Sequence, residues 1–125
     1  MAKKILVIDD DVLVMKTVSR YLKTCGYEVT AVTSGEEAIK QSASSAYDLI
    51  IADMRMPGMN GIETIKKIRE ICQKQGKTKI PEIIITGYAS DEAQEEAKAA
   101  GISEYIYKPF EIAVFIDAVK RSLGE

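Results

Sequence analysis

Five short apolar segments alternate along the chain with longer segments in which apolar residues recur every three or four positions. The segments Lys4–Ile8 and 49–52 are continuously apolar, which is typical of strands that are buried on both faces of a sheet. Segment 27–32 alternates more between apolar and polar residues, which predicts an edge strand. Segments 82–85 and Glu104–Tyr107 complete a set of five predicted strands.

Capping residues and glycines mark the ends of five predicted helices. The first helix follows residues 9–11 and ends at Gly26, and Ser34 with Glu37 forms a capping box that predicts a helix over Gly35–Ser44. The third helix is capped by Asn60, and the fourth runs from about Ser90 to Gly101. The core-facing stripes predicted for the first, third and last helices are Val14, Val18, Tyr21 and Leu22; Ile62, Ile65, Ile68 and Ile71; and Ile112, Phe115, Ile116, Val119 and Leu123.

Strict alternation of strands and helices predicts right-handed crossovers and a parallel sheet covered on both faces. We therefore expect one α/β domain spanning residues 1–125, a doubly wound flavodoxin-like fold. The strand order 2-1-3-4-5 is taken from known folds of this class, in which ligands bind outside the carboxyl ends of the strands. Ala113 and Val114 lie off the stripe of the last helix. They are interpreted either as ordinary exposed residues or as a contact for a partner or a second copy.

Polar residues stand where four of the predicted strands end. Asp9 and Asp10 follow the first strand, Asp53 the third, Thr86 the fourth and Lys108 the fifth. Each has an ordinary alternative as a helix cap, a turn residue or a solvated charge. Because parallel strands end at one edge of the sheet, we expect all of them to converge there.

Three aspartates at that edge would repel one another, so the cluster needs a cation or a proton. Oxygen ligands alone favour a hard divalent ion, Mg²⁺ with Mn²⁺ as the alternative. The chain contains no histidine, which excludes His-based acid–base catalysis and His metal sites. The residues suit phosphoryl transfer: Asp53 as nucleophile, Lys108 as a positive charge for the phosphoryl group and the Thr86 hydroxyl as a hydrogen-bond donor.

Composition adds few constraints. The net charge of −2 gives no electrostatic reason to expect nucleic acid or an anionic membrane as a partner. The first apolar segment is too short for a signal peptide or a membrane span, so a cytoplasmic location is expected. Cys25 and Cys72 are in no metal-ligand spacing and are interpreted as small apolar core residues.

The chain resembles the receiver domain of two-component response regulators, including the chemotaxis-regulator type, over essentially its whole length. The matching motifs are Ile-Leu-Val-Ile-Asp-Asp-Asp at 5–11, Asp-Met-Arg-Met-Pro-Gly-Met-Asn-Gly at 53–61, Ile-Thr-Gly at 85–87 and Tyr-Ile-Tyr-Lys-Pro-Phe at 105–110. The resemblance is similar for receivers that belong to longer regulators and to hybrid kinases, so a free-standing protein and an excised receiver both remain open.

The resemblance implies that Asp53 accepts a phosphoryl group from a histidine kinase or a histidine phosphotransfer protein. The protein would then be a signalling phosphoacceptor that catalyses its own phosphorylation and dephosphorylation, rather than an enzyme acting on other substrates. Mg²⁺ would be held by Asp10, Asp53 and the main-chain carbonyl of Arg55, with Asp9 acting through water. The Lys108–Pro109 bond is often cis in this family.

The resemblance also implies a switch and a control of phosphoryl lifetime. Thr86 would move toward the phosphoryl group and Tyr105 would turn inward, remodelling the face formed by the fourth helix, fifth strand and fifth helix. That face would control a downstream partner or output domain, or form a homodimer. Arg55 and Tyr88 would flank the path of the attacking water, and because both are large we expect slow self-dephosphorylation.

Three rival functions are compared with this one. A haloacid-dehalogenase-type phosphatase requires a motif whose last position Leu13 does not match, and it needs room for a cap domain. A flavodoxin-like FMN binder needs a phosphate loop after the first strand, where the aspartates at 9–11 would repel phosphate. A receiver-like binding module that works without phosphorylation remains the alternative.

Overall fold

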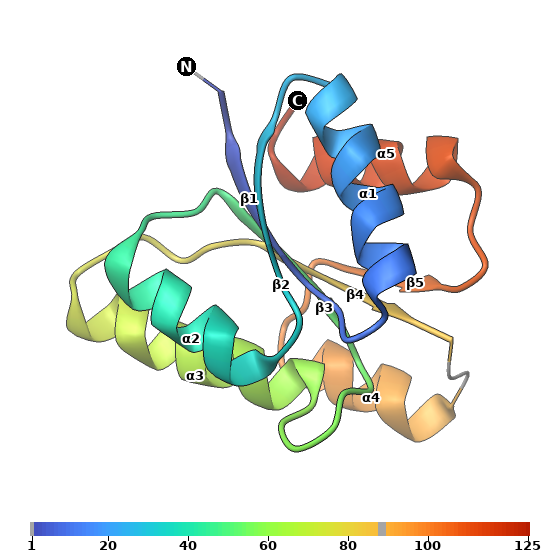
Figure 1. Cartoon of the computed structure of the whole chain (residues 1–125). Helices are drawn as coiled ribbons and strands as arrows, with labels where there is room; N and C mark the ends of the chain where they lie inside the picture. Colours follow the sequence, from blue (N-terminus) through green and yellow to red (C-terminus); the bar gives the residue numbers. More distant parts are fainter. Residues whose placement is uncertain (1, 88–89) are drawn as a thin grey trace.

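The chain folds into a five-stranded parallel sheet with helices on both faces (Figure 1), and this computed structural model describes residues 2–87 and 90–125. The strands lie in the order β2-β1-β3-β4-β5, which confirms the predicted topology. The elements are β1 (Lys4–Ile8), α1 (Val12–Thr24), β2 (Glu28–Val32), α2 (Gly35–Ser44), β3 (Leu49–Asp53), α3 (Gly61–Lys74), β4 (Glu82–Thr86), α4 (Asp91–Ala99), β5 (Glu104–Tyr107) and α5 (Ile112–Ser122).

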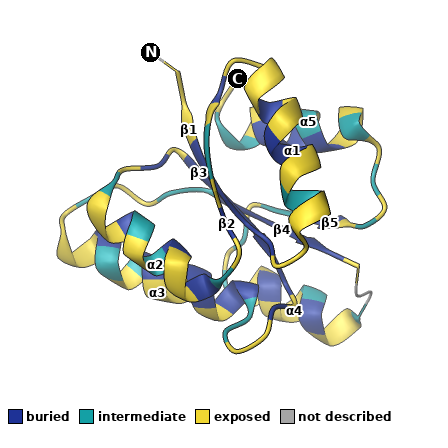
Figure 2. Ribbon diagram, viewed as in Figure 1, coloured by how far each residue is buried: buried dark blue, intermediate teal, exposed yellow. Residues whose placement is uncertain are grey.

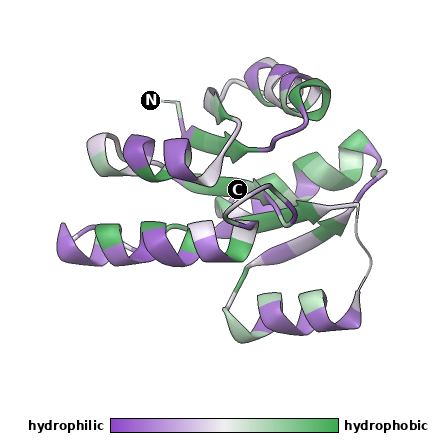
Figure 3. Ribbon diagram, turned by 60° about the horizontal axis from the view of Figure 1, so that its bottom comes forward, coloured by the Kyte–Doolittle hydropathy of each residue, from purple (hydrophilic) through white to green (hydrophobic). Residues whose placement is uncertain are grey.

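Two apolar clusters hold the helices against the two faces of the sheet. Helices α1 and α5 cover one face, while α2, α3 and α4 lie on the other. Alternate residues of β1 enter different clusters: Val7 belongs to the cluster that contains Phe115 of α5, and Leu6 belongs to the cluster that contains Ile65 of α3. Continuous apolar strands are required because both faces are covered. Figures 2 and 3 show the buried, hydrophobic residues concentrated on the central strands and the exposed, hydrophilic ones on the outer sides of the helices.

Both predicted N-caps are present, but of the capping box predicted at Ser34 and Glu37 only the bond to the Ser34 side chain forms, whereas the complete capping box lies at Asn60 and Glu63. The Ser34 hydroxyl accepts a hydrogen bond from the Glu37 N–H at 3.2 Å. The Asn60 side chain accepts one from the Glu63 N–H at 2.9 Å, and the Glu63 carboxylate accepts one from the Asn60 N–H at 3.1 Å. These caps start α2 and α3 where the sequence indicates, so the local signals and the tertiary fold agree.

Three sequence-based placements differ from the structure. Tyr21 is 42% exposed, although it was assigned to the core stripe of α1. Only Val18 and Leu22 of that stripe are fully buried, because the helical rotation turns the residue before Leu22 toward solvent. Cys25 is exposed because it caps the end of α1, beyond the last residue that packs on the sheet. In α3, Cys72 rather than Ile71 completes the buried stripe.

Val114 is 51% exposed, and Ala113 is exposed beside it, as the pattern of the last helix predicts. Helix α5 therefore presents apolar surface next to β5. Within the described ranges, no helix combines the length and the hydrophobicity needed to span a bilayer.

Candidate functional site

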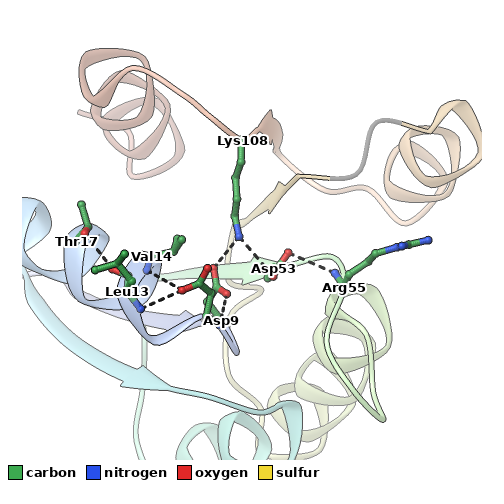
Figure 4. A network of polar contacts seen from close by, with 8 residues as sticks. Asp9, Leu13, Val14, Thr17, Asp53, Arg55 and Lys108 are labelled. Atoms are coloured by element: carbon green, nitrogen blue, oxygen red, sulfur yellow. Dashed lines mark hydrogen bonds and ion pairs between the residues drawn. The ribbon is translucent and has the colours of Figure 1, made fainter.

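Polar side chains from four strands meet at one edge of the sheet. Asp53 is the last residue of β3, Thr86 is the last residue of β4, and Asp9 directly follows β1. The register pairs Ile8 with Ala52, so Asp9 and Asp53 are the next residues of two neighbouring strands. Lys108 follows β5, and its long side chain reaches back across the sheet to both aspartates (Figure 4).

The carboxylates of Asp9, Asp10 and Asp53 each offer an oxygen, and these oxygens lie within 4.8 Å of one another. Asp9 is fully buried, Asp53 is 6% exposed and Asp10 is exposed. Three such carboxylates are poorly compatible with one another unless a positive charge is close. Their donor set consists of oxygen alone and is open on the Asp10 side, which fits a hard divalent cation such as Mg²⁺.

Lys108 supplies one positive charge to this cluster. Its Nζ donates to Asp9 Oδ2 at 3.0 Å and to Asp53 Oδ2 at 3.5 Å. Burial favours the neutral amine, but the hydrogen bonds and negative charges of the two aspartates outweigh it and raise the pKa of Lys108. One ammonium against three carboxylates leaves the site with an excess of negative charge.

The Asp53 carboxyl has a pKa raised from 3.8 to about 6. Burial is the main cause and the nearby charge of Asp9 adds to it, while Lys108 and the Arg55 N–H act in the opposite direction. The Arg55 N–H donates to Asp53 Oδ1 at 3.4 Å. Because this pKa still lies below neutral pH, most Asp53 side chains are ionised there.

The main chain holds both buried aspartates in place. Asp9 Oδ1 accepts a hydrogen bond from the Asp11 N–H at 2.9 Å, and Asp11 itself caps α1 by accepting from the Leu13 N–H at 3.0 Å. After Asp53, the Met54 carbonyl accepts from the Gly61 N–H at 3.1 Å, which ties the loop to the start of α3. The acidic site is therefore anchored to the first turns of two helices.

The residues proposed for switching occupy neighbouring strands. Thr86 is fully buried, and Tyr105 is partly buried against the cluster beneath α4. The register of β4 and β5 pairs Ile84 with Tyr105 and Thr86 with Tyr107, so Thr86 and Tyr105 point to the same face of the sheet. The Tyr105 hydroxyl is buried and has no hydrogen-bond partner among the described residues.

Two further sequence-based assignments concern the rim of the site. The exposed side chain of Arg55 extends away from Asp53 and Lys108 in Figure 4. Tyr88 lies outside the described residues. The Lys108–Pro109 peptide bond is cis, as the resemblance suggests.

An apolar groove beside the acidic site was not predicted from the sequence. It has a volume of about 680 Å³ and lies between α1, from Leu13 to Tyr21, and the loop after β5. Leu13, at 75% exposure, is its most exposed large apolar residue, and Lys108 forms part of the same lining. Val14 lines this groove and also packs against the core cluster, as its stripe predicts, whereas Tyr21 lines the groove and is exposed. Only the tertiary structure shows that the groove adjoins Lys108.

Comparison with known proteins gives the same family over almost the whole chain. A family model described as the response regulator receiver domain matches residues 5–120. The transcriptional regulatory protein ResD of Bacillus subtilis is 34% identical over 98% of this chain, which spans 50% of that relative. Hybrid signal transduction histidine kinase L of Dictyostelium discoideum is 35% identical over 94% of this chain, which spans 7% of that relative. The chain thus covers half or less of the length of these two curated relatives.

A solved structure of the Vibrio cholerae chemotaxis protein CheY4 matches with a TM-score of 0.88 and 33% identity, covering 98% of this chain and 100% of that one. Neither a dehalogenase-type phosphatase nor an FMN binder agrees with these matches. The fold, the acidic edge of the sheet and the matched sequence lead to one conclusion: the chain belongs to the family of response regulator receiver domains.

Proposed function

We propose that Asp53 accepts a phosphoryl group from a phosphohistidine on a histidine kinase or a phosphotransfer protein. The observation that carries the proposal is the position of Asp53: a nearly buried carboxylate at a strand end, 3.5 Å from the ammonium of Lys108 and grouped with two further aspartates. Such a carboxylate is a nucleophile held beside the positive charge that a phosphoryl group requires.

The transfer balances with the groups at hand. An oxygen of the ionised Asp53 carboxylate attacks phosphorus, and a new O–P bond forms while the N–P bond of the phosphohistidine breaks. The electron pair of the broken bond remains on the imidazole nitrogen of the donor. Lys108 contributes charge neutralisation to the phosphoryl oxygens. No histidine is needed in this chain, and none is present.

Asp10, Asp53 and the main-chain carbonyl of Arg55 would hold Mg²⁺, with Asp9 acting through water and Mn²⁺ as the alternative ion. When bound, the divalent ion supplies positive charge that offsets the negative charges of the cluster and of the phosphoryl group. The support is the oxygen-only set of Asp9, Asp10 and Asp53. Loss of the phosphoryl group as inorganic phosphate, by attack of water at phosphorus, would make the chain its own phosphatase.

The phosphodonor would dock in the groove between α1 and the loop after β5. Leu13 offers an exposed apolar anchor there, and Lys108 lines the same groove. An apolar surface beside the nucleophile would bring a donor protein close enough for transfer, whereas a small phosphodonor would not need it.

Phosphorylation would act on the α4–β5–α5 face through Thr86 and Tyr105. Both side chains belong to one face of neighbouring strands, and the unpartnered Tyr105 hydroxyl would gain a hydrogen bond in a rearranged state. A few kcal/mol of such differential contact are enough to shift a two-state equilibrium. The exposed Val114 on α5 would take part in contacts with a downstream partner, an output domain or a second copy.

Arg55 and Tyr88 would set the lifetime of the acyl phosphate by shielding it from water. We expect that replacing both by Ala accelerates the decay of the phosphorylated form. An unchanged decay rate would show that neither side chain covers the phosphoryl group.

The experiment that tests the proposal is an intact-mass measurement after incubation with acetyl phosphate, with and without Mg²⁺, on wild type and Asp53→Asn. A gain of one phosphoryl group that requires both Mg²⁺ and Asp53 is expected. If folded, Mg²⁺-binding protein gains no mass, a phosphohistidine protein is tried next as the donor. Failure with both donors would contradict the proposal and favour a binding module that works without phosphorylation.

A further inference from the structure

A basic stripe runs along α1 on the side of the edge strand β2. Lys16, Arg20 and Lys23 are spaced by four and three residues, which places their side chains on one face of the helix. All three are exposed, and in residues 2–87 and 90–125 none of them forms an ion pair with a carboxylate. In a chain of net charge −2, this stripe is a local excess of positive charge.

The stripe borders a groove of about 690 Å³ whose other side is formed by Val29 and Ala31 of β2. Ser19 also lines the groove; it is 7% exposed, and its Oγ is buried with no hydrogen-bond partner among the described residues. The neighbouring hydroxyls of Thr17 and Thr24 instead donate to main-chain carbonyls of α1, each at 2.9 Å. The Ser19 hydroxyl is therefore buried at the wall of the groove, and the helix does not use it as a donor.

The strand that borders the groove has an open edge. Among the described strands, β2 pairs only with β1. In a parallel pair, alternate residues direct their main-chain groups toward the partner strand. The Glu28 N–H donates to the Lys3 carbonyl at 2.9 Å, and the Val32 carbonyl accepts from the Asp9 N–H at 3.2 Å. Residues 28, 30 and 32 therefore face β1. Residues 29 and 31 direct their N–H and C=O groups outward, beside the groove that their side chains line.

We propose that this groove binds an extended acidic segment of a partner protein, which pairs with the open edge of β2 and directs alternate carboxylates toward the basic stripe of α1. Alternate side chains of a strand are spaced by about 6.6–6.8 Å. Along the helix axis, Lys16 and Arg20 are about 6 Å apart and Arg20 and Lys23 are about 4.5 Å apart, so the first interval is close to the strand repeat and the second is shorter. The outward main-chain groups supply the pairing and the cations select the charge of the partner.

Other occupants fit this surface less well. Pairing β2 with β2 of a second copy would bring two basic stripes together. The described lining of the groove contains no aromatic side chain on which bases could stack, as a single-stranded nucleic acid would require. The proposed groove lies along the outermost strand β2, whereas Asp53 lies at the carboxyl end of β3. The proposal does not rest on phosphorylation.

The test titrates the protein with a capped peptide, Glu-Val-Glu-Val-Glu, and follows main-chain amide signals by NMR. We expect shifts concentrated at residues 28–32, and slower hydrogen exchange at the amides of Val29 and Ala31. Combined replacement of Lys16, Arg20 and Lys23 by Gln is expected to weaken binding about tenfold or more. The matched control replaces three exposed lysines of α3, Lys66, Lys67 and Lys74, by Gln and should retain the wild-type affinity.

A second arm tests strand pairing separately from charge. Ala31→Pro removes an outward N–H that β1 does not use, so the ladder between β1 and β2 is retained while peptide binding is lost. If that variant fails to fold, the same peptide with N-methyl groups on alternate residues tests the pairing on the wild-type protein. Equal affinity for Lys-Val-Lys-Val-Lys, equal affinity of the triple Gln variant, or unaltered binding of the N-methylated peptide would each overturn the proposal.

Discussion

Gly61 lies directly against the main chain of Asp53. A Cβ atom at position 61 would overlap the Asp53 carbonyl oxygen and would also press on Ile84. The first residue of α3 can pack under the end of β3 only because it has no side chain. The proposed phosphoacceptor and the start of α3 are thus held at a fixed separation by a single glycine.

Gly61→Ala is therefore expected to lower the free energy of unfolding by about 1–3 kcal/mol, because main-chain atoms must shift to relieve the overlap. The favourable helix propensity of alanine reduces this loss but does not cancel it. Chemical denaturation measures the effect. Gly87→Ala is the matched control, since no atom of the described residues lies within 4 Å of a Cβ there. Equal stability of the two variants would contradict the packing argument.

Removal of the Asp53 charge should stabilise the metal-free protein in a pH-dependent way. The Asp53 pKa is raised from 3.8 to about 6 by burial and by Asp9, so the folded state holds this proton more tightly than the unfolded state does. The free energy of unfolding then falls as pH rises from about 4 to about 6. Above pH 6, Asp53→Asn should be more stable than wild type by about 1–2 kcal/mol, after reduction for solvent screening.

Urea unfolding in EDTA at pH 7.5 and at pH 4.5 tests this linkage, and the gain should be clearly smaller at the lower pH, which lies between the pKa values of the unfolded and folded states. Asp117→Asn, on the exposed side of α5, provides a control without a buried charge. A stability gain of the same size at both pH values would mean that the like charges of the cluster are not its cause.

Lys108 and a divalent ion would both neutralise the excess negative charge of the aspartates. Lys108→Ala should therefore have opposite effects on Mg²⁺ binding and on phosphorylation. Loss of the ammonium that lies 3.0 Å from Asp9 should strengthen Mg²⁺ binding, because a competing cation is gone. The same loss should slow phosphorylation by acetyl phosphate on the order of 100-fold, because a charge that stabilises the transferring group is missing. Calorimetry and intact-mass kinetics measure the two effects, and weaker Mg²⁺ binding would contradict the first.

The groove next to Lys108 predicts a difference between large and small phosphodonors. Leu13→Asp places a charge on an apolar anchor that is 75% exposed, so it should slow transfer from a phosphohistidine protein at least tenfold. The rate with acetyl phosphate should stay the same, because a small donor does not use the groove. Val114→Asp on α5 is the matched control. A parallel loss with both donors would indicate damage to the site rather than to docking.

A buried ion pair at the opposite end of β4 was not predicted from the sequence. Arg69 donates from Nε and Nη2 to the two carboxylate oxygens of Glu82 at 2.8 and 2.9 Å. The Glu82 side chain is 1% exposed, whereas that of Arg69 is 27% exposed. Arg69→Met should therefore cost about 3 kcal/mol or more, since it leaves an unpaired buried carboxylate.

Glu82→Gln should cost less, about 1–2 kcal/mol, because the released guanidinium can still reach water. Denaturation of the two variants ranks the losses. The reverse ranking would show that the carboxylate is better hydrated than its burial indicates.

The sequence by itself determined the elements of this protein and the chemistry available at their ends. Continuous apolar strands, capped helices and their alternation are local signals, and they predicted the sheet, the order of elements and the start of α2 correctly. The resemblance carried by the motifs around Asp53 and Lys108 identified the receiver family. Both depend on residue type and spacing, which are visible along the chain.

Contacts between distant segments were decided by the tertiary structure alone. Tyr21 fits the stripe of α1 yet lines a groove, because the helical rotation that buries Leu22 turns Tyr21 toward solvent. The Lys108 ammonium lies closer to Asp9 than to Asp53, and Arg69 forms an ion pair with Glu82. The relative positions of neighbouring strands and helices determine these distances. Periodicity indicates which side of a helix or strand is apolar, but only the assembled fold determines which residues that side packs against.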